Sequence, residues 1–219
     1  MDKEPWPSQA KNQIVQVADW LPGDDPLVFP VGSKPKKLIL CPENANAPFL
    51  IPGHRYLFKT TPGWREQQLW SEVIAYEFSK LCGITAPPCF AAFNGRTNES
   101  GVLMEFFYGY PDEAQTVRFV AGTDAIQRAD STYDSRTGRP HEVSRNIAVC
   151  RRSGVPASAA LEWWAKTMAF DALIGNTDRH AENWGPLRGG SDDAAQGTEW
   201  SMAPPFDHGT SLGYEILEK

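Results

Sequence analysis

Residues 173–187, LIGNTDRHAENWGPL, and residues 205–213, PFDHGTSLG, decide how this sequence is interpreted. The first stretch places Asp178 and Asn183 five residues apart, in a loop behind a long amphipathic segment. The second places Asp207 just before a turn that contains glycine and serine. Phosphoryl transfer uses a carboxylate, an amide and a second carboxylate to orient a hydroxyl group and to hold Mg²⁺ against nucleotide phosphates. Together the two stretches therefore predict a phosphotransfer site.

Each of these three residues has its own predicted role. We expect Asp178 to be the catalytic residue that accepts or orients the hydroxyl proton, because a loop after a buried helix holds a base in fixed geometry. Asn183 and Asp207 are the predicted metal ligands, since Mg²⁺ prefers hard oxygen atoms and takes only one or two carboxylates. The alternative is that both aspartates only form turns. Arg179 could brace the loop, and a histidine such as His180 is more often structural than catalytic.

A lysine and a glutamate upstream extend the predicted site. Lys59 lies near the end of an expected strand, from which it can contact the α- and β-phosphates of a nucleotide, and Glu72 in the following helix can hold it in place. Glu77 lies on nearly the same helix face, but Glu72 is nearer to Lys59 along the helix. A turn whose backbone amides and lysines favour phosphate is also predicted, at Gly32, Ser33, Lys34 and Lys36.

Composition limits the class of protein. The chain has 219 residues, a net charge of −6 and an apolar fraction of 41 %, which suits a globular protein of one domain or two small lobes. The acidic balance argues against direct nucleic-acid binding. Without a membrane-spanning apolar run or a signal peptide, we expect a cytoplasmic protein that binds no membrane. Four cysteines lack the paired spacing of a zinc site: Cys41, Cys82, Cys89 and Cys150.

Apolar periodicity predicts a first half rich in β-strands. Strands are expected within residues 27–42 and 54–64, and on both sides of a turn within residues 87–107. A helix is expected over residues 65–84, with Gly83 at its end. This half therefore reads as a small β-rich lobe with one helix.

The second half is expected to be more helical. Residues 129–145 are polar and rich in turn formers, which predicts a mobile loop or insertion. A helix is expected over residues 158–175, and strands over 183–187 and 199–206. One stripe of this helix is predicted to face the core, and it consists of Leu161, Trp164, Ala165, Met168, Ala169, Ala172 and Leu173.

These motifs resemble the HipA-like kinases, the toxin-associated serine/threonine kinases. The resemblance lies in LIGNTDRHAEN and PFDHGTSLG, and more loosely in GSKPK, YLFK and SEVIAYEFSKLCGITAPP. The DRHxxN pattern also occurs in phosphatidylinositol 3/4-kinase-like enzymes. From about Val31 onwards, the resemblance implies an α+β, bilobal protein-kinase-like fold. It implies a small β-rich N-lobe with one main helix at residues 1–108, and a mainly helical C-lobe at residues 109–219.

The resemblance also implies an activity, the transfer of the γ-phosphoryl group of ATP to a protein serine or threonine with the help of Mg²⁺. Matched position by position, Asp178 is the catalytic aspartate, Asn183 and Asp207 are the metal ligands, and Lys59 is the ATP lysine. Residues 104–107 match the hinge, so adenine is expected to contact the backbone of Glu105, Phe106 and Phe107. An antitoxin-type partner is implied as well.

Three positions depart from the family pattern. Glu182 stands where many HipA-like proteins have lysine. Phe29 and Pro30 stand where some members carry an autophosphorylated serine before the turn, although Ser33 lies within the turn. The chain ends soon after Asp207, where family members commonly add a further helical region.

Other functions stay open at this point. The acceptor could be a lipid or a small molecule instead of a protein. A metal-dependent phosphoesterase could use the Asp178–His180 and Asp207–His208 pairs, but would leave the upstream lysine and glutamate without a role. A pseudokinase or partner-binding module is favoured by Glu182 and the short C-terminus, and is opposed by the complete set of predicted catalytic and ligand residues.

Overall fold

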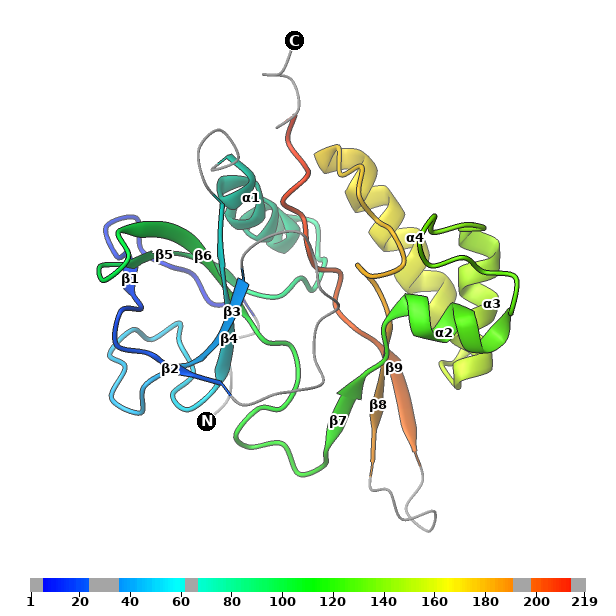
Figure 1. Ribbon diagram of the computed structural model, residues 1–219, viewed down its shortest axis with the longest axis horizontal. Helices are drawn as coiled ribbons and strands as arrows, with labels where there is room; N and C mark the ends of the chain where they lie inside the picture. The colour runs from blue at the N-terminus through cyan, green and yellow to red at the C-terminus, as the bar shows by residue number, and fades with distance from the viewer. Residues whose placement is uncertain (1–5, 24–35, 62–66, 191–197, 214–219) are drawn as a thin grey trace. The chain divides into compact units, whose positions relative to one another are not determined.

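The computed structural model describes residues 6–23, 36–61, 67–190 and 198–213 (Figure 1). The chain divides into two compact units. The first comprises the residues up to Pro111 together with those from His208 onwards, and the second is Asp112–Asp207. The lobe limits at 1–108 and 109–219 stay a prediction. No helix in the described ranges is both long and apolar enough to cross a membrane.

A six-stranded sheet forms the body of the first unit, in the order β1-β5-β6-β4-β3-β2. Its strands are β1 (Val15–Gln16), β2 (Leu21–Pro22), β3 (Lys36–Leu40), β4 (Arg55–Thr60), β5 (Cys89–Asn94) and β6 (Glu99–Glu105). β1 runs parallel to β5, and the other neighbours pair antiparallel. β4 confirms the strand predicted within residues 54–64, of which 62–64 lie outside the described residues, and β5 and β6 confirm the two strands predicted within 87–107. Within 27–42, β3 is present and residues 27–35 lie outside the described residues.

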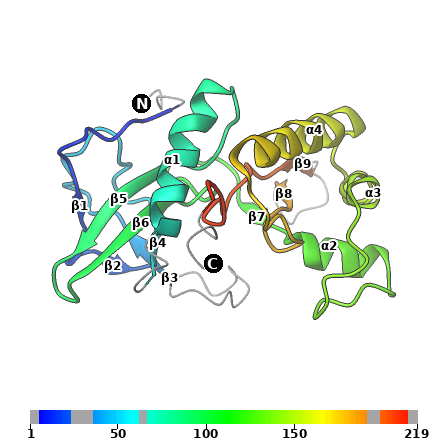
Figure 2. The same ribbon diagram turned by 90° about the horizontal axis from the view of Figure 1, so that it is seen from above.

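The helix of the first unit is α1 (Gln67–Leu81), which packs on β5 and β6 (Figures 1 and 2). Its buried face includes Leu69, Ala75 and Tyr76, and the ring of Tyr76 lies edge-on to Phe90 of β5. Gly83 follows the helix with φ of 65°, a left-handed conformation that glycine adopts without strain. The predicted helix and its glycine end are therefore confirmed.

The described residues of the second unit form three strands and three helices. β7 (Val117–Phe119), β8 (Pro186–Gly189) and β9 (Glu199–Met202) form an antiparallel sheet. The helices are α2 (Gly122–Ala129), α3 (Val143–Ser153) and α4 (Ala157–Ile174). The predicted long helix is thus confirmed as α4, whereas α2 and α3 were not predicted. The polar stretch expected as a loop corresponds to residues 130–142 between them, outside any helix or strand.

The predicted core face of α4 is wrong. Of that stripe only Trp164 is buried, while Leu161, Met168 and Leu173 are 59 %, 41 % and 62 % exposed. The buried side chains are Ala160, Trp164, Thr167, Phe170, Asp171 and Ile174. Both sides of α4 carry apolar residues, so periodicity alone cannot choose between them. The choice follows from contacts distant in sequence, above all the edge-on packing of Trp164 against Trp184 at 5.0 Å between ring centroids.

Replacing Trp164 by alanine should lower the free energy of unfolding by about 3–5 kcal/mol, because it removes a buried ring from the core. The matched change Leu173→Ala, on the exposed face of the same helix, should have little effect. Urea unfolding followed by circular dichroism measures both. Equal losses for the two variants would show that α4 buries the face predicted from sequence.

Candidate functional site

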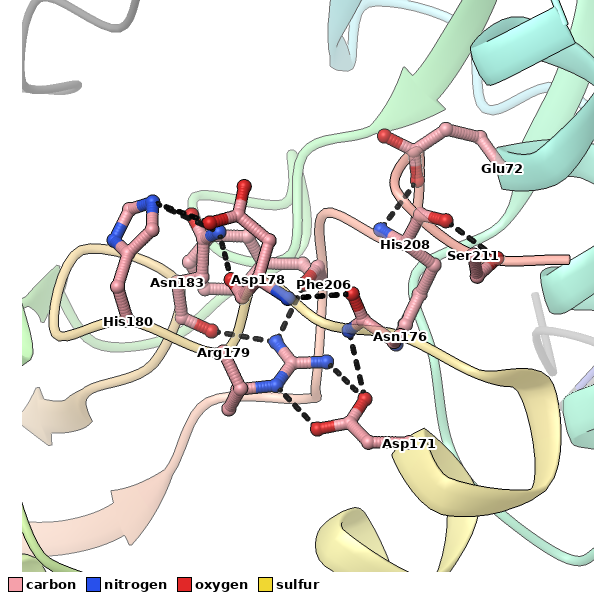
Figure 3. A network of polar contacts seen from close by, with 10 residues as sticks. All are labelled: Glu72, Asp171, Asn176, Asp178, Arg179, His180, Asn183, Phe206, His208 and Ser211. Atoms are coloured by element: carbon pink, nitrogen blue, oxygen red, sulfur yellow. Dashed lines mark hydrogen bonds and ion pairs between the residues drawn. The ribbon is translucent and has the colours of Figure 1, made fainter. Parts of the chain in front are cut away.

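Arg179 occupies the centre of the predicted catalytic loop (Figure 3). Its guanidinium donates to both carboxylate oxygens of Asp171 on α4, from Nε at 2.9 Å and from Nη2 at 2.8 Å. The remaining Nη1 donates to the backbone carbonyls of Asn183 at 2.7 Å and of Phe206 at 2.6 Å. Arg179 and Asp171 are both buried. One side chain therefore joins the helix, the loop and the residue before Asp207.

Arginine suits this position for a chemical reason. Its planar fork of donors matches a carboxylate bidentately and still has a donor directed elsewhere, which a lysine ammonium cannot reproduce. The ion pair leaves neither charge uncompensated in the interior, where an unpaired charge is costly. The bracing role considered for Arg179 is thus present, and it acts on both segments that carry the predicted metal ligands.

Asp178 and Asn183 face each other across the same loop. The side-chain nitrogen of Asn183 donates to the carbonyl oxygen of Asp178 at 2.8 Å, and the Asp178 amide donates to Asn176 Oδ1 at 3.2 Å. The Asp178 side chain itself is 44 % exposed, whereas Asn183 is buried. The loop thus fixes the backbone of Asp178 and leaves its carboxylate accessible, as a base that meets an external hydroxyl group requires.

Asp207 has a left-handed backbone, with φ of 59°. This conformation is uncommon outside glycine, although aspartate tolerates it better than most residues. Asp207 directly follows Phe206, and the carbonyl of Phe206 accepts a hydrogen bond from Arg179. Strain of this kind is typical of functional positions.

The donor set fits a magnesium ion. Because Asn183 Nδ2 is engaged by Asp178, a cation would be bound through Asn183 Oδ1 together with the carboxylate of Asp207. Mg²⁺ commonly takes one or two such oxygens from the protein and completes its shell with phosphate and water. Among the described residues, no group of three or more His, Cys, Asp or Glu side chains is placed to hold a metal ion.

Two histidines lie near the loop. His180 Nδ1 accepts from the Glu182 amide at 3.2 Å, and His180 Nε2 lies 3.3 Å from Asn183 Nδ2 and 3.6 Å from Asp178 Oδ1. Nε2 of His141 lies 3.1 Å from the side-chain nitrogen of Asn146 and accepts from Trp184 Nε1 at 3.3 Å. Since the indole nitrogen can only donate, His141 is neutral here. Burial, and secondarily the charge of His180, lowers the pKa of His141.

The first unit holds the predicted lysine and glutamate together. Lys59 Nζ lies 2.6 Å from Glu72 Oε1, and both side chains are buried. The other carboxylate oxygen of Glu72 accepts from the backbone amide of His208 at 3.0 Å. Glu77, the other candidate partner for Lys59, pairs with Lys80 instead, and Glu77 Oε2 lies 2.5 Å from Lys80 Nζ. The choice of Glu72 as the partner of Lys59 is confirmed, and the nucleotide role of the pair stays a prediction.

The predicted phosphate turn lies mostly outside the described residues, which exclude Gly32, Ser33 and Lys34. Lys36 begins β3 and is the cross-strand partner of Lys59 on β4. Directly opposed residues of antiparallel strands point to the same face, roughly 5 Å apart at Cβ. Sequence order alone did not predict this juxtaposition of two lysines.

The predicted hinge, residues 104–107, begins within β6, and two of its backbone amides are engaged in hydrogen bonds. Phe106 N donates to Arg55 O at 3.1 Å, and Phe106 O lies 2.6 Å from His54 Nε2, so the amide of Phe106 cannot also reach adenine. The Glu105 amide donates to Pro88 O at 2.8 Å. An adenine at this hinge would therefore not accept hydrogen bonds from these two amides as they are paired here.

Comparison with known proteins agrees with this architecture. The sequence model of the family described as HipA-like C-terminal domain matches residues 32–217. No curated protein sequence matches the chain. Two solved structures share the kinase-like fold at low identity.

The first is the Helicobacter pylori proinflammatory kinase CtkA, with a TM-score of 0.65, 18 % identity and 93 % of this chain covered. The second comes from the Shewanella oneidensis MR-1 complex of HipA, HipB and operator DNA, with a TM-score of 0.51, 15 % identity and 90 % covered. The present chain spans 62 % and 52 % of those chains. The likeness establishes the fold, and with it the expected α+β kinase-like architecture.

Breaking the Arg179 network should destabilise the second unit. Asp171→Asn keeps the shape of the side chain but leaves the guanidinium without its counter-charge, which should cost about 3–5 kcal/mol in the free energy of unfolding. The control is Glu162→Gln, which breaks an exposed pair with Lys166 on the same helix and should leave stability unchanged. Chemical denaturation measures both. An Asp171→Asn protein as stable as the control would contradict the bracing role.

Acidification should destabilise the protein through His141. Its folded pKa lies below the ordinary value of 6.5, so the unfolded chain binds the proton more readily as the pH falls through about 6.5. Stability is therefore complete above this range and decreases below it. His141→Gln, which keeps an acceptor but cannot be protonated, should flatten the fall in melting temperature between pH 7 and pH 5. An unchanged pH profile in that variant would show that folding does not lower the pKa of His141.

Proposed function

Since the chain belongs to the family of the HipA-like C-terminal domain, we propose that it is a kinase that uses ATP and Mg²⁺. The acceptor of the γ-phosphoryl group is the hydroxyl of a protein serine or threonine. The kinase-like fold supports the general activity, and the acceptor rests on the family resemblance. An antitoxin-type partner stays a prediction on the same ground.

The observation that carries this proposal is the Arg179 network. It joins the carbonyl of Asn183 to the carbonyl of Phe206, and so holds the amide ligand and the segment of the carboxylate ligand in one rigid cluster. A structural turn would have no need of a buried charge with four acceptor contacts, because burying a charge is expensive. A metal site does need such support, since ligands held about 1 Å too loosely lose their function.

The roles of the remaining residues follow from their positions. Asp178, with its carboxylate exposed and its backbone fixed, orients the acceptor hydroxyl and takes its proton. Asn183 Oδ1 and the Asp207 carboxylate hold Mg²⁺, which neutralises charge on the phosphate oxygens. Lys59, aimed by Glu72, contacts the α- and β-phosphates.

The opposed lysines of β3 and β4 support an anionic ligand in the first unit. Like charges directly across an antiparallel pair are destabilising by themselves. A phosphate group bound between Lys36 and Lys59 would be attracted by both ammonium groups, and Glu72 pairs with Lys59 in the structure. This pattern is expected for a site that binds a phosphate group, as the proposed nucleotide site does.

Two aspartate variants test the proposal by separating binding from chemistry. Asp178→Ala should reduce transfer from γ-labelled ATP by about 100-fold or more and leave the dissociation constant of Mg-ATP unchanged, because the base contacts the acceptor. Asp207→Asn should weaken Mg-ATP binding, because it removes a charged ligand. Calorimetry with and without Mg²⁺ and a transfer assay with cell extract measure the two effects.

The outcomes are distinct. Loss of transfer in both variants, with loss of Mg-ATP affinity only in Asp207→Asn, supports the assigned roles. Normal transfer by Asp178→Ala would remove the catalytic assignment. An absence of Mg-ATP binding by the parent protein would favour a pseudokinase or partner-binding module. Glu162→Gln serves as the control, because it changes an exposed carboxylate on α4 outside the predicted site and should alter neither transfer nor Mg-ATP affinity.

A further inference from the structure

An apolar pocket of about 260 Å³ lies beside α1, and none of the residues assigned above to the predicted site lines it. One wall is the flank of α1 with Leu69, Trp70 and Val73, and another is the edge strand with Ile14 and Gln16. Its floor is formed by residues 91–93 of β5 and 100–102 of β6. Figure 2 shows α1 lying over these two strands, which its contacts confirm. All of these residues belong to the first unit.

The chemistry of the pocket selects an uncharged occupant. None of the described residues that line it is charged. The polar side chains among them are Gln16 and Ser100, both exposed and both able to donate and accept hydrogen bonds. A nucleotide or another anion would therefore find no counter-charge in the lining. Its size is suited to one large apolar side chain.

Exposed apolar residues continue beyond the pocket. Ile14 and Trp70 at its mouth are 58 % and 59 % exposed, and Ile74, one turn further along α1, is 50 % exposed. Large apolar residues that adjoin one another on a surface mark interaction sites more often than single ones do. A free small molecule that filled only the pocket would leave these residues in water. An occupant that buries them must extend on both sides of the anchoring group.

We propose that this pocket is a docking site for a peptide segment of a partner protein, which inserts one aromatic side chain and covers the rim with flanking aliphatic residues. Gln16 and Ser100 are placed to pair with the peptide's backbone amides. β1 adds to this fit because it is the edge strand of the sheet in the described residues. Peptides commonly bind where a sheet edge and a side-chain pocket adjoin.

Docking at this pocket is coupled to Glu72. Leu69 and Val73, which line the pocket, lie three residues before and one residue after Glu72 on α1. Glu72 holds Lys59 and the backbone amide of His208. Ser71 donates to the carbonyl of Ser211 at 3.0 Å. A segment that packs α1 more firmly on the sheet therefore steadies Lys59, which, on the proposed function, tightens nucleotide binding.

The test uses three probes and the full chain. The first is Ac-Gly-Leu-Phe-Leu-Gly-NH₂, the second replaces its phenylalanine by glycine, and the third is Ac-Phe-NH₂. Binding is followed by amide chemical shifts without nucleotide, so this arm is independent of any kinase activity. We expect saturable binding of the first peptide, at least about tenfold tighter than that of the other two. The second peptide loses the burial of the phenylalanine and the third loses the burial of both leucines, and each of these losses costs more than this factor.

Matched tryptophan substitutions locate the binding. Val73→Trp fills the pocket and should abolish binding of the first peptide. Leu81→Trp, at an 83 % exposed position of the same helix outside the pocket, should not. If Val73→Trp fails to fold, Ser100→Trp on the opposite wall replaces it. No saturable binding, or equal binding by both tryptophan variants, overturns the site. Equal affinity for Ac-Phe-NH₂ and the pentapeptide would assign the pocket to a small aromatic molecule and overturn peptide docking.

The coupling is measured separately. The first peptide should lower the dissociation constant of Mg-ATP by about fivefold or more. Mg-ATP should lower the dissociation constant of the peptide by the same factor. Glu72→Gln should reduce this coupling while peptide binding persists. Peptide binding with an unchanged Mg-ATP affinity overturns the regulatory link alone. Peptide binding in a protein that never binds Mg-ATP refutes the proposed kinase and leaves the docking site standing.

Discussion

The guanidinium of Arg179 is the interaction on which the site in the second unit depends. A buried cation is tolerable only when its donors are satisfied, and here Asp171 provides the counter-charge while two backbone carbonyls take the remaining donor. The network therefore ties a loop with no regular secondary structure to the rigid helix α4. It also fixes the chain at Phe206, one residue before Asp207. The geometry of the loop that carries Asp178 and Asn183 therefore depends on this single side chain.

A second buried ion pair gives the first unit its own rigid element. Lys59 and Glu72 join β4 to α1, and Glu72 also holds the backbone where the chain re-enters this unit at His208. In both units a buried charge is used to aim a polar group rather than to add stability, since hydrophobic replacements of such pairs are often as stable. In both units the carboxylate that aims the polar group is carried by a long helix, Glu72 by α1 and Asp171 by α4.

Sequence reasoning succeeded where the information is local. The ends of α1 and α4 follow from Gly83 and Gly175, and the partner of Lys59 follows from helix register. It failed where contacts between residues far apart in the sequence determine the structure. The buried face of α4 depends on Trp184 and on Arg179, which lie after the helix, and the engaged amide of Phe106 depends on Arg55, fifty-one residues earlier. The sequence feature that could have indicated the Arg179 network is an aspartate, Asp171, within an apolar helix and eight residues before an arginine. Taken alone, such an aspartate looks like an ordinary exposed polar position of the helix.

The central claim is that Asn183 and Asp207 form one metal site braced by Arg179. A crystal structure with a non-hydrolysable ATP analogue and Mn²⁺ tests it most directly, because the anomalous signal of manganese locates the ion. The account predicts an ion at about 2.1–2.2 Å from Asn183 Oδ1 and from a carboxylate oxygen of Asp207, in contact with phosphate oxygens, and with the Arg179 contacts retained. A well-ordered nucleotide whose ion touches neither residue would contradict it.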